Sequence, residues 1–209
     1  MILIALGAGL AVVYGGWFCW RDPSWLRSAI KTGAVALPAI ALGQMGVPGV
    51  ALAGLWACAL GDYLLSRPAE LTLKAGIGAF ALGHILYVVG FVSLFDPGRP
   101  DLLFWTVTGG LIALGASTEL WLSAHTGPLR PLVRIYVGLI LGMGICAALP
   151  GLPREFLLTG ALSFVASDLI LSTLIFLGWT ARWASYAVWG LYWLAQALIM
   201  AGFWQVAAA

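Results

Sequence analysis

Apolar runs of about 20 residues recur from one end of this sequence to the other, separated by short polar segments. A bilayer offers no water to backbone N–H and C=O groups, so only helices or closed barrels cross it. Runs of this length match helices that span the hydrocarbon core. Hydrophobic residues make up 62% of the chain and charged residues 9%. The sequence therefore predicts an all-α, polytopic membrane protein with a single transmembrane domain over residues 1–209.

Charged residues, prolines and glycines gather between the apolar runs and mark the breaks. Seven breaks lie at residues 21–23, 44–48, 67–70, 96–101, 125–128, 150–153 and 178–182. They predict eight spans, at residues 1–20, 30–45, 47–66, 73–95, 101–122, 130–149, 154–177 and 183–206. The second span is the least regular, because it is short, contains Pro38 and begins beside Lys31.

Basic residues are distributed unevenly over the seven predicted loops. The odd-numbered loops hold Arg21, Arg27, Lys31, Arg67, Lys74, Arg130, Arg134 and Arg182. The even-numbered loops hold only Arg99 and Arg154, and the termini hold none. Because cytoplasmic loops are enriched in lysine and arginine, we expect the odd loops to face the cytoplasm and both termini to lie on the other side. In a bacterium the protein would reside in the cytoplasmic membrane.

Composition also excludes several classes of protein. A net charge of +2 is too small to indicate nucleic-acid binding. The three cysteines, Cys19, Cys58 and Cys146, lie in apolar runs and form no disulfide pattern. No basic segment precedes the first apolar run, so we expect that run to remain as a span rather than to be removed as a signal peptide.

Two aspartates stand inside these apolar runs in similar local sequences. Asp62 lies in GDYLLS, residues 61–66, and Asp168 lies in SDLILS, residues 167–172. A charged side chain at the centre of a span costs about 3 kcal/mol on insertion scales, so it usually marks a functional site. The two aspartates are separated by about half of the chain. We therefore predict a 4+4 internal repeat whose axis lies along the membrane normal and brings both carboxylates to similar depth.

Further polar side chains occur within the predicted spans. They are Lys31, His84, Tyr87, Tyr136, Ser167, Tyr192 and Gln196. With the predicted orientation, most of them fall in the cytoplasmic half of the bilayer, which predicts one polar cavity open toward that leaflet. Structural interpretations remain open: Lys31 could snorkel to the interface, and Ser167 could bond to its own helix. The histidine, tyrosine and glutamine side chains could instead link neighbouring helices.

Other site chemistries have little support in the sequence. A zinc site formed by Asp62, His84 and Asp168 is an alternative, but no spacing of His and Cys ligands requires it. Neither a nucleophile elbow nor a glycine-rich phosphate or dinucleotide motif occurs. We therefore expect neither a metal nor an organic cofactor.

Taken together, these residues resemble the signature of the YhhN family of integral membrane proteins. In chain order the matching residues are Lys31, Gly61-Asp62, Leu65, Phe80-x-x-Gly83-His84-x-x-Tyr87, Tyr136, Ser167-Asp168 and Tyr192-x-x-x-Gln196. They cover nearly the whole chain and follow the eight-span layout. Each motif is short, but their order and spacing are specific in combination. One departure is Thr32, which stands where the family often has a proline after the lysine.

The characterised animal members of this family are lysoplasmalogenases, so the resemblance implies hydrolysis of the vinyl ether bond of lysoplasmalogens. The substrate would be a lysophospholipid, and the products would be a fatty aldehyde and glycerophosphoethanolamine or glycerophosphocholine. This chemistry needs one carboxylic acid and one carboxylate, and two close buried carboxylates tend to share one proton. Asp62 and Asp168 would be this catalytic pair, and the sequence does not decide which of them is the acid.

The resemblance also implies roles for the other polar residues. His84 and Tyr87 would orient water or tune the aspartate pair, and Lys31 would bind the phosphate of the headgroup as a point charge. The residues that would line the headgroup region are Tyr136, Ser167, Tyr192 and Gln196. The expected partners are the lipid substrate and the bilayer, and the sequence leaves the oligomeric state open.

Two rival functions remain open at the level of sequence. Intramembrane acids, a central histidine and an internal repeat are also features of proton-coupled transporters and flippases. Against transport, the chain shows no pair of helices interrupted by glycine or proline at matching positions. A membrane scaffold or sensor without catalysis would have no need for two intramembrane acids.

Overall fold

The structure is a computed structural model that describes residues 1–95 and 98–208, about 83% of them helical and none of them in a strand. Its α-helices are α1 (Ile2–Val13), α2 (Trp25–Gln44), α3 (Gly49–Leu65), α4 (Glu70–Ser93), α5 (Leu102–Trp121), α6 (Arg130–Ala147), α7 (Arg154–Phe176) and α8 (Arg182–Ala207). A π-helical segment, Tyr14–Phe18, extends α1, and two 3-10 turns follow α5. The all-α class is confirmed. Asp96 and Pro97, in the predicted fourth break, lie outside the described residues.

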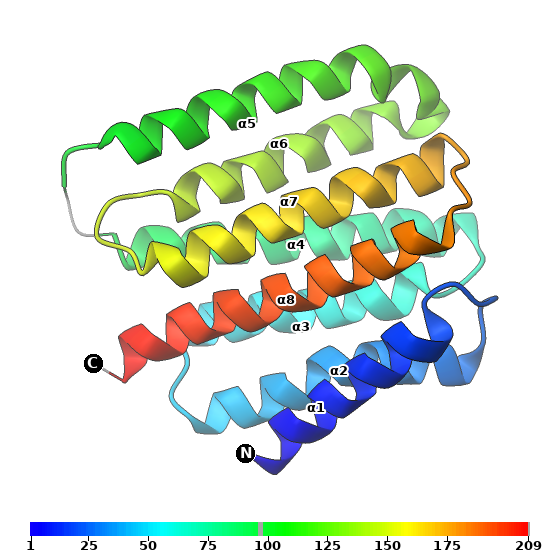
Figure 1. Cartoon of the computed structure of the whole chain (residues 1–209), viewed down its shortest axis with the longest axis horizontal. Coiled ribbons are helices and arrows are strands. Elements are labelled where there is room, and N and C mark those ends of the chain that lie inside the picture. Colours follow the sequence, from blue (N-terminus) through cyan, green and yellow to red (C-terminus); the bar gives the residue numbers. More distant parts are fainter. Residues whose placement is uncertain (96–97, 209) are drawn as a thin grey trace. The chain divides into compact units, whose positions relative to one another are not determined.

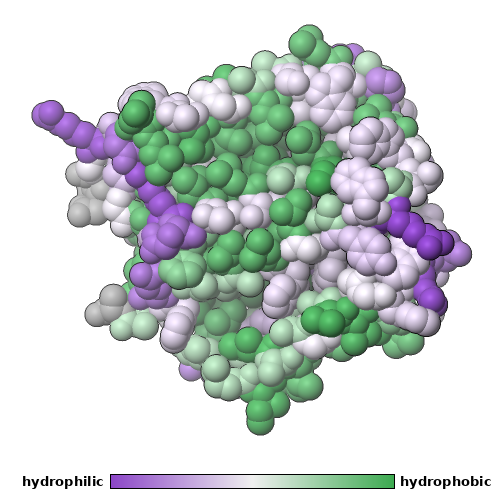
Figure 2. Space-filling view, viewed as in Figure 1, coloured by the Kyte–Doolittle hydropathy of each residue, from purple (hydrophilic) through white to green (hydrophobic). Residues whose placement is uncertain are grey.

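At least five helical segments are long and apolar enough to cross a membrane. They are Glu70–Ser93, Leu102–His125, Gly127–Ala147, Arg154–Phe176 and Arg182–Ala207. Large apolar side chains such as Trp105, Ile112 and Leu120 remain exposed on them, and apolar residues cover much of the face seen in Figure 2. Such a surface suits lipid rather than water. The number of spans, their orientation and the 4+4 repeat remain predictions.

The second helix begins at Trp25, whereas the sequence predicted a span from residue 30. The reason is Ser24, whose side-chain oxygen accepts a hydrogen bond from the backbone N–H of Arg27 at 3.1 Å. A serine in this position satisfies one of the open N–H groups at the start of a helix. The charged segment that contains Arg27 is therefore helical rather than part of a loop.

The chain forms two compact units. The first unit contains residues 1–87 together with the end of the chain from Phe203, and the second unit contains residues 88–202. In the first unit, α1 lies beside α2 and α2 lies beside α3 (Figure 1). In the second unit, α5, α6 and α7 lie side by side in chain order (Figure 1). Helices α4 and α8 each contribute residues to both units.

Helix α1 approaches α2 closely at Pro38. A Cβ atom at Gly7 would lie 2.4 Å from Cδ of Pro38 and 3.2 Å from the carbonyl oxygen of Ala34. Proline cannot donate the hydrogen bond that this carbonyl would otherwise accept within α2. Because Gly7 has no side chain, α1 packs directly against the proline ring at this irregular point of α2.

Small residues also join α3 to α4 in the first unit. A Cβ atom at Gly54 would lie 2.6 Å from Cε1 of Tyr87, and one at Gly83 would lie 2.7 Å from Sγ of Cys58. Within a bilayer, helices associate through van der Waals packing, which small residues improve by letting backbones approach. The α3–α4 contact therefore depends on the absence of side chains at these glycines.

We expect Gly83→Ala to lower the free energy of unfolding by about 1–3 kcal/mol, because the added methyl group overpacks this contact. Cys58 is fully buried, and the carbonyl oxygen of Gly54 would lie 3.2 Å from the new Cβ, so little room exists for relaxation. Gly78→Ala on the same helix is the matched control, since a Cβ there meets no atom within 4 Å. Thermal unfolding in detergent measures both variants, and equal melting temperatures would contradict the expected overpacking.

In the second unit, Asp101 ties the start of α5 to the start of α7. Its side chain accepts a hydrogen bond from the backbone N–H of Phe104 at 2.9 Å and pairs with Arg154 at 2.5 Å. The hydrogen bond from Arg154 holds the pKa of Asp101 below its usual range. Farther along α7, Gly160 lets α8 approach: a Cβ there would lie 2.9 Å from Cγ1 of Ile199.

Candidate functional site

Asp62 and Lys31 form an ion pair inside the first unit. The ammonium nitrogen of Lys31 lies 2.9 Å from Oδ1 of Asp62, and the side chains are 16% and 1% exposed. Helix α3 carries Asp62 in its last turn and α2 carries Lys31 in its second turn. A charge in an apolar helix requires a close counter-ion. The ammonium of Lys31 therefore pairs with Asp62 inside the unit and does not only extend toward the membrane interface.

Arg67 lies just beyond the end of α3 and binds the first turn of α2. Its Nη2 donates to Oγ of Ser28 at 2.6 Å and to the carbonyl oxygen of Ser24 at 2.8 Å. Ser28 precedes Lys31 by about one turn of the helix, so Arg67 holds the end of α3 close to the segment that carries the ion pair. From the sequence alone, Arg67 was expected only to lie in a loop.

Tyr14 is a candidate site residue that was not predicted from the sequence. Its side chain is buried, with 3% of the residue exposed. The guanidinium of Arg27 lies 5.5 Å from the centre of its ring. Tyr14 also begins the π-helical segment. π-Helical turns are rare in proteins, and those that do occur are often found at functional sites. The two glycines that follow Tyr14 inside an apolar run were the available signal for an irregular helix.

His84 and Tyr87 are fully buried on α4. The contact between Gly83 and Cys58 fixes the register of α4 against α3. The two helices are antiparallel, since Gly61 on α3 also meets Phe80 on α4. His84 and Asp62 therefore stand about 7 Å apart along the helix axes, which is more than one turn. Four predicted site residues therefore belong to the first unit: Lys31, Asp62, His84 and Tyr87.

Asp168 has a neutral hydroxyl partner in the second unit. The hydroxyl group of Tyr136 on α6 donates a hydrogen bond to Oδ2 of Asp168 on α7. The neighbouring Ser167 is 1% exposed and donates to the carbonyl oxygen of Val188 on α8 at 2.9 Å. Ser167 thus links α7 to α8, and the alternative in which it bonds to its own helix is wrong.

Tyr192 and Gln196 are buried one turn apart on α8. The ring of Tyr192 meets the ring of Phe164 edge-on, with centroids 5.3 Å apart. Phe164 precedes Asp168 by one turn of α7, so both lie on the same face of that helix. Four predicted residues thus belong to the second unit together with Asp168: Tyr136, Ser167, Tyr192 and Gln196. Joint action of Asp62 and Asp168 remains a prediction.

Comparison with known proteins gives a family and a few distant relatives. The model of the YhhN family matches residues 25–203. The uncharacterised membrane protein YhhN of Escherichia coli O157:H7 is 32% identical over 115 residues, which are 51% of this chain and 53% of the relative. A lysoplasmalogenase of Mycobacterium tuberculosis (strain CDC 1551 / Oshkosh) is 28% identical over 148 residues, 69% of this chain and 56% of the relative. The chain thus spans about half the length of these curated relatives, and no solved structure matches it.

Proposed function

This chain belongs to the YhhN family, and from that premise we propose that it is a membrane hydrolase that cleaves the vinyl ether bond of lysoplasmalogens. The name of the mycobacterial relative supports this class of reaction. The observation that carries the proposal is that two aspartates inside apolar helices have unlike partners. Asp62 pairs with the ammonium of Lys31, and Asp168 accepts a hydrogen bond from the neutral hydroxyl of Tyr136.

These unlike partners suit the two carboxyl states that the reaction needs. Asp62 acts as the carboxylate, because Lys31 neutralises its charge in place. Asp168 acts as the acid, because a protonated carboxyl needs no counter-ion in an apolar helix and its Oδ2 still accepts from Tyr136. The sequence left this assignment open, and the identity of the partners supports one choice.

The reaction begins when Asp168 gives its proton to the β-carbon of the vinyl ether, which forms an oxocarbenium ion. Water adds to the carbon beside the ether oxygen, and Asp62 accepts the proton that the water loses. The resulting hemiacetal then collapses: Asp168 takes the proton of the hemiacetal hydroxyl, Asp62 gives its proton to the glycerol oxygen, and the bond between that oxygen and the carbon breaks. The aldehyde and the glycerophospho alcohol are released, and both aspartates regain their starting states. One water is consumed and nothing is oxidised. Glycosidases use carboxyl pairs for a similar oxocarbenium-like state.

The basic residues of the first unit suit the phosphate of the substrate. Lys31 keeps two further N–H donors after it pairs with Asp62, and one of them binds a phosphate oxygen in this proposal. Arg27 and Arg67 add positive charge near the same end of α2. His84 and Tyr87 orient the attacking water. In this proposal the headgroup region is lined by Tyr136, Ser167, Tyr192 and Gln196.

We expect the purified protein in detergent to release a fatty aldehyde from an alkenyl lysophosphoethanolamine. The matched control substrate is the saturated alkyl ether of the same chain length, which has no double bond to protonate and should give no aldehyde. EDTA should leave the rate unchanged, because the ammonium of Lys31 already holds the place at Asp62 that a metal ion would need.

Two results would count against this function. If a folded, monodisperse sample released no aldehyde, the vinyl ether reaction would be wrong, and a proton-flux assay in liposomes would test the transporter alternative. If EDTA abolished the release and zinc restored it, a metal would replace Lys31 as the partner of Asp62.

A further inference from the structure

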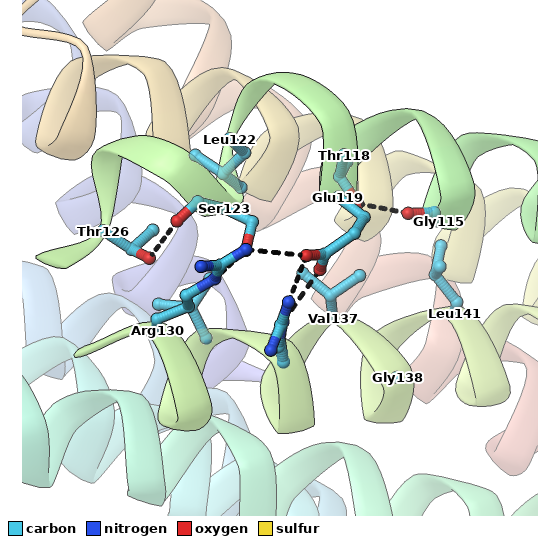
Figure 3. A pocket seen from close by; sticks show the side chains of 12 residues that line it. Gly115, Thr118, Glu119, Leu122, Ser123, Thr126, Arg130, Val137, Gly138 and Leu141 are labelled. Atoms are coloured by element: carbon cyan, nitrogen blue, oxygen red, sulfur yellow. Dashed lines mark hydrogen bonds and ion pairs between the residues drawn. The ribbon is translucent and has the colours of Figure 1, made fainter. Parts of the chain in front are cut away.

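A pocket of about 270 Å³ lies between α5 and α6, within the second unit and apart from the proposed catalytic residues. One end of the pocket is polar and the other is apolar. Glu119, Ser123, Thr126, Arg130 and Arg134 lie at the polar end beside Leu122 and Val133, and the mainly apolar end is formed by Gly115, Thr118, Val137, Gly138 and Leu141. Figure 3 shows this separation, with Ser123 and Arg130 at one end and Leu141 at the other.

The polar end has an excess of positive charge. Arg134 and Arg130 both pair with the single carboxylate of Glu119, Arg130 at 3.2 Å, and Nε of Arg130 donates to Oγ of Ser123 at 2.7 Å. Two guanidinium groups against one carboxylate leave a net charge of +1. The three charged side chains are 42–52% exposed, so a ligand can reach them. Their described contacts use Nε and Nη2 of each arginine, which leaves the Nη1 groups as donors.

The basic groups lead directly into the apolar part of the groove. Arg130, Arg134, Gly138 and Leu141 follow one another on a single face of α6, because they are spaced by four, four and three residues. A Cβ atom at Gly138 would meet no atom within 4 Å, so no side chain of the protein fills the groove at that point. A ligand that fits must therefore join a negatively charged head to an apolar chain.

We propose that this pocket binds an anionic phospholipid of the surrounding bilayer, with its phosphodiester on Arg130 and Arg134 and the start of one acyl chain over Gly138. Guanidinium groups match phosphate oxygens in geometry and charge. A head with one negative charge neutralises the net charge of the pocket, whereas a zwitterionic head does not. The site is independent of the proposed hydrolysis, since it shares no residue with it.

The test is a lipid titration of the detergent-purified protein by native mass spectrometry. Phosphatidylglycerol should bind more tightly than phosphatidylcholine with the same acyl chains. Arg130→Gln/Arg134→Gln should weaken phosphatidylglycerol binding by about 25-fold, because each basic group near a membrane surface is worth about fivefold in affinity. The matched control is Arg182→Gln, which removes an exposed arginine outside the pocket and should leave the affinity unchanged.

Two further variants separate charge from shape. Gly138→Leu keeps every charge and fills the groove, so it should also weaken phosphatidylglycerol binding. Glu119→Gln retains an oxygen for the arginines but raises the net charge to +2, so it should tighten binding by about fivefold. Thermal unfolding of each variant shows that it is folded.

The proposal fails if phosphatidylglycerol and phosphatidylcholine bind equally well, or if the double arginine variant binds phosphatidylglycerol as the wild type does. It also fails if Glu119→Gln weakens phosphatidylglycerol binding, because removing a negative charge from the pocket should favour an anionic head. Unchanged binding by Gly138→Leu would overturn the placement of the acyl chain in the groove.

Discussion

Asp168→Asn should reduce the release of aldehyde from a lysoplasmalogen by about 10³-fold, the range typical of a lost general acid. An amide cannot give up a proton to the β-carbon of the vinyl ether. The carbonyl oxygen of the new asparagine can still accept the hydrogen bond from Tyr136, so the protein should remain folded and bind its substrate. The effect should therefore appear in kcat, with little change in KM.

The matched control is Asp22→Asn, since Asp22 is an exposed aspartate before α2 and should not affect turnover. Asp62→Asn should also lose activity, because it removes the group that takes the proton of the attacking water. If Asp168→Asn kept more than about a tenth of the wild-type kcat, Asp168 would not be the acid. A loss confined to KM would instead make it a binding residue.

Apolar length was enough to predict the all-α class and to place most helix boundaries, because a membrane helix must satisfy its own backbone within each run. The start of α2 was less accessible to prediction. A charged segment with Arg27 and Lys31 is typical of a loop, and only the serine cap at Ser24 shows that it is helical. Capping serines are common enough in loops that Ser24 alone does not settle the boundary.

The sequence also predicted Asp62 and Asp168 as candidate site residues, but it did not predict the partner that each has in the structure. The cost of an unpaired carboxylate in an apolar run marks each aspartate without any structure. The partner of Asp62 is Lys31, which lies on another helix. Ser167, next to Asp168, donates to a backbone carbonyl of α8, and such a contact cannot be read from residue types. Two similar six-residue segments therefore acquired different surroundings, a cation in one case and a hydroxyl in the other.

Because Asp62 is paired with a cation, replacing either member of the Lys31–Asp62 pair should lower the free energy of unfolding. Breaking a buried ion pair by removing one partner costs about 3–5 kcal/mol, because the other charge stays behind. Lys31→Met should have the larger cost, since it leaves the carboxylate of Asp62 at 1% exposure. Asp62→Asn should cost less, because Lys31 is 16% exposed and its flexible chain can turn the ammonium toward the interface.

The double variant Lys31→Met/Asp62→Asn should recover most of the loss, since it leaves no uncompensated charge. Denaturant titrations in detergent give the free energies of unfolding of the wild type and the three variants, and the double-mutant cycle formed by these four values gives the coupling between the two side chains. Lys74→Met is the matched control: Lys74 pairs with Glu70 at 2.6 Å, but both side chains are well exposed, so it should cost less than about 1 kcal/mol. If Lys31→Met cost no more than this control, the carboxylate of Asp62 would not depend on Lys31. Its role as the ionised partner in hydrolysis would then lose its physical basis.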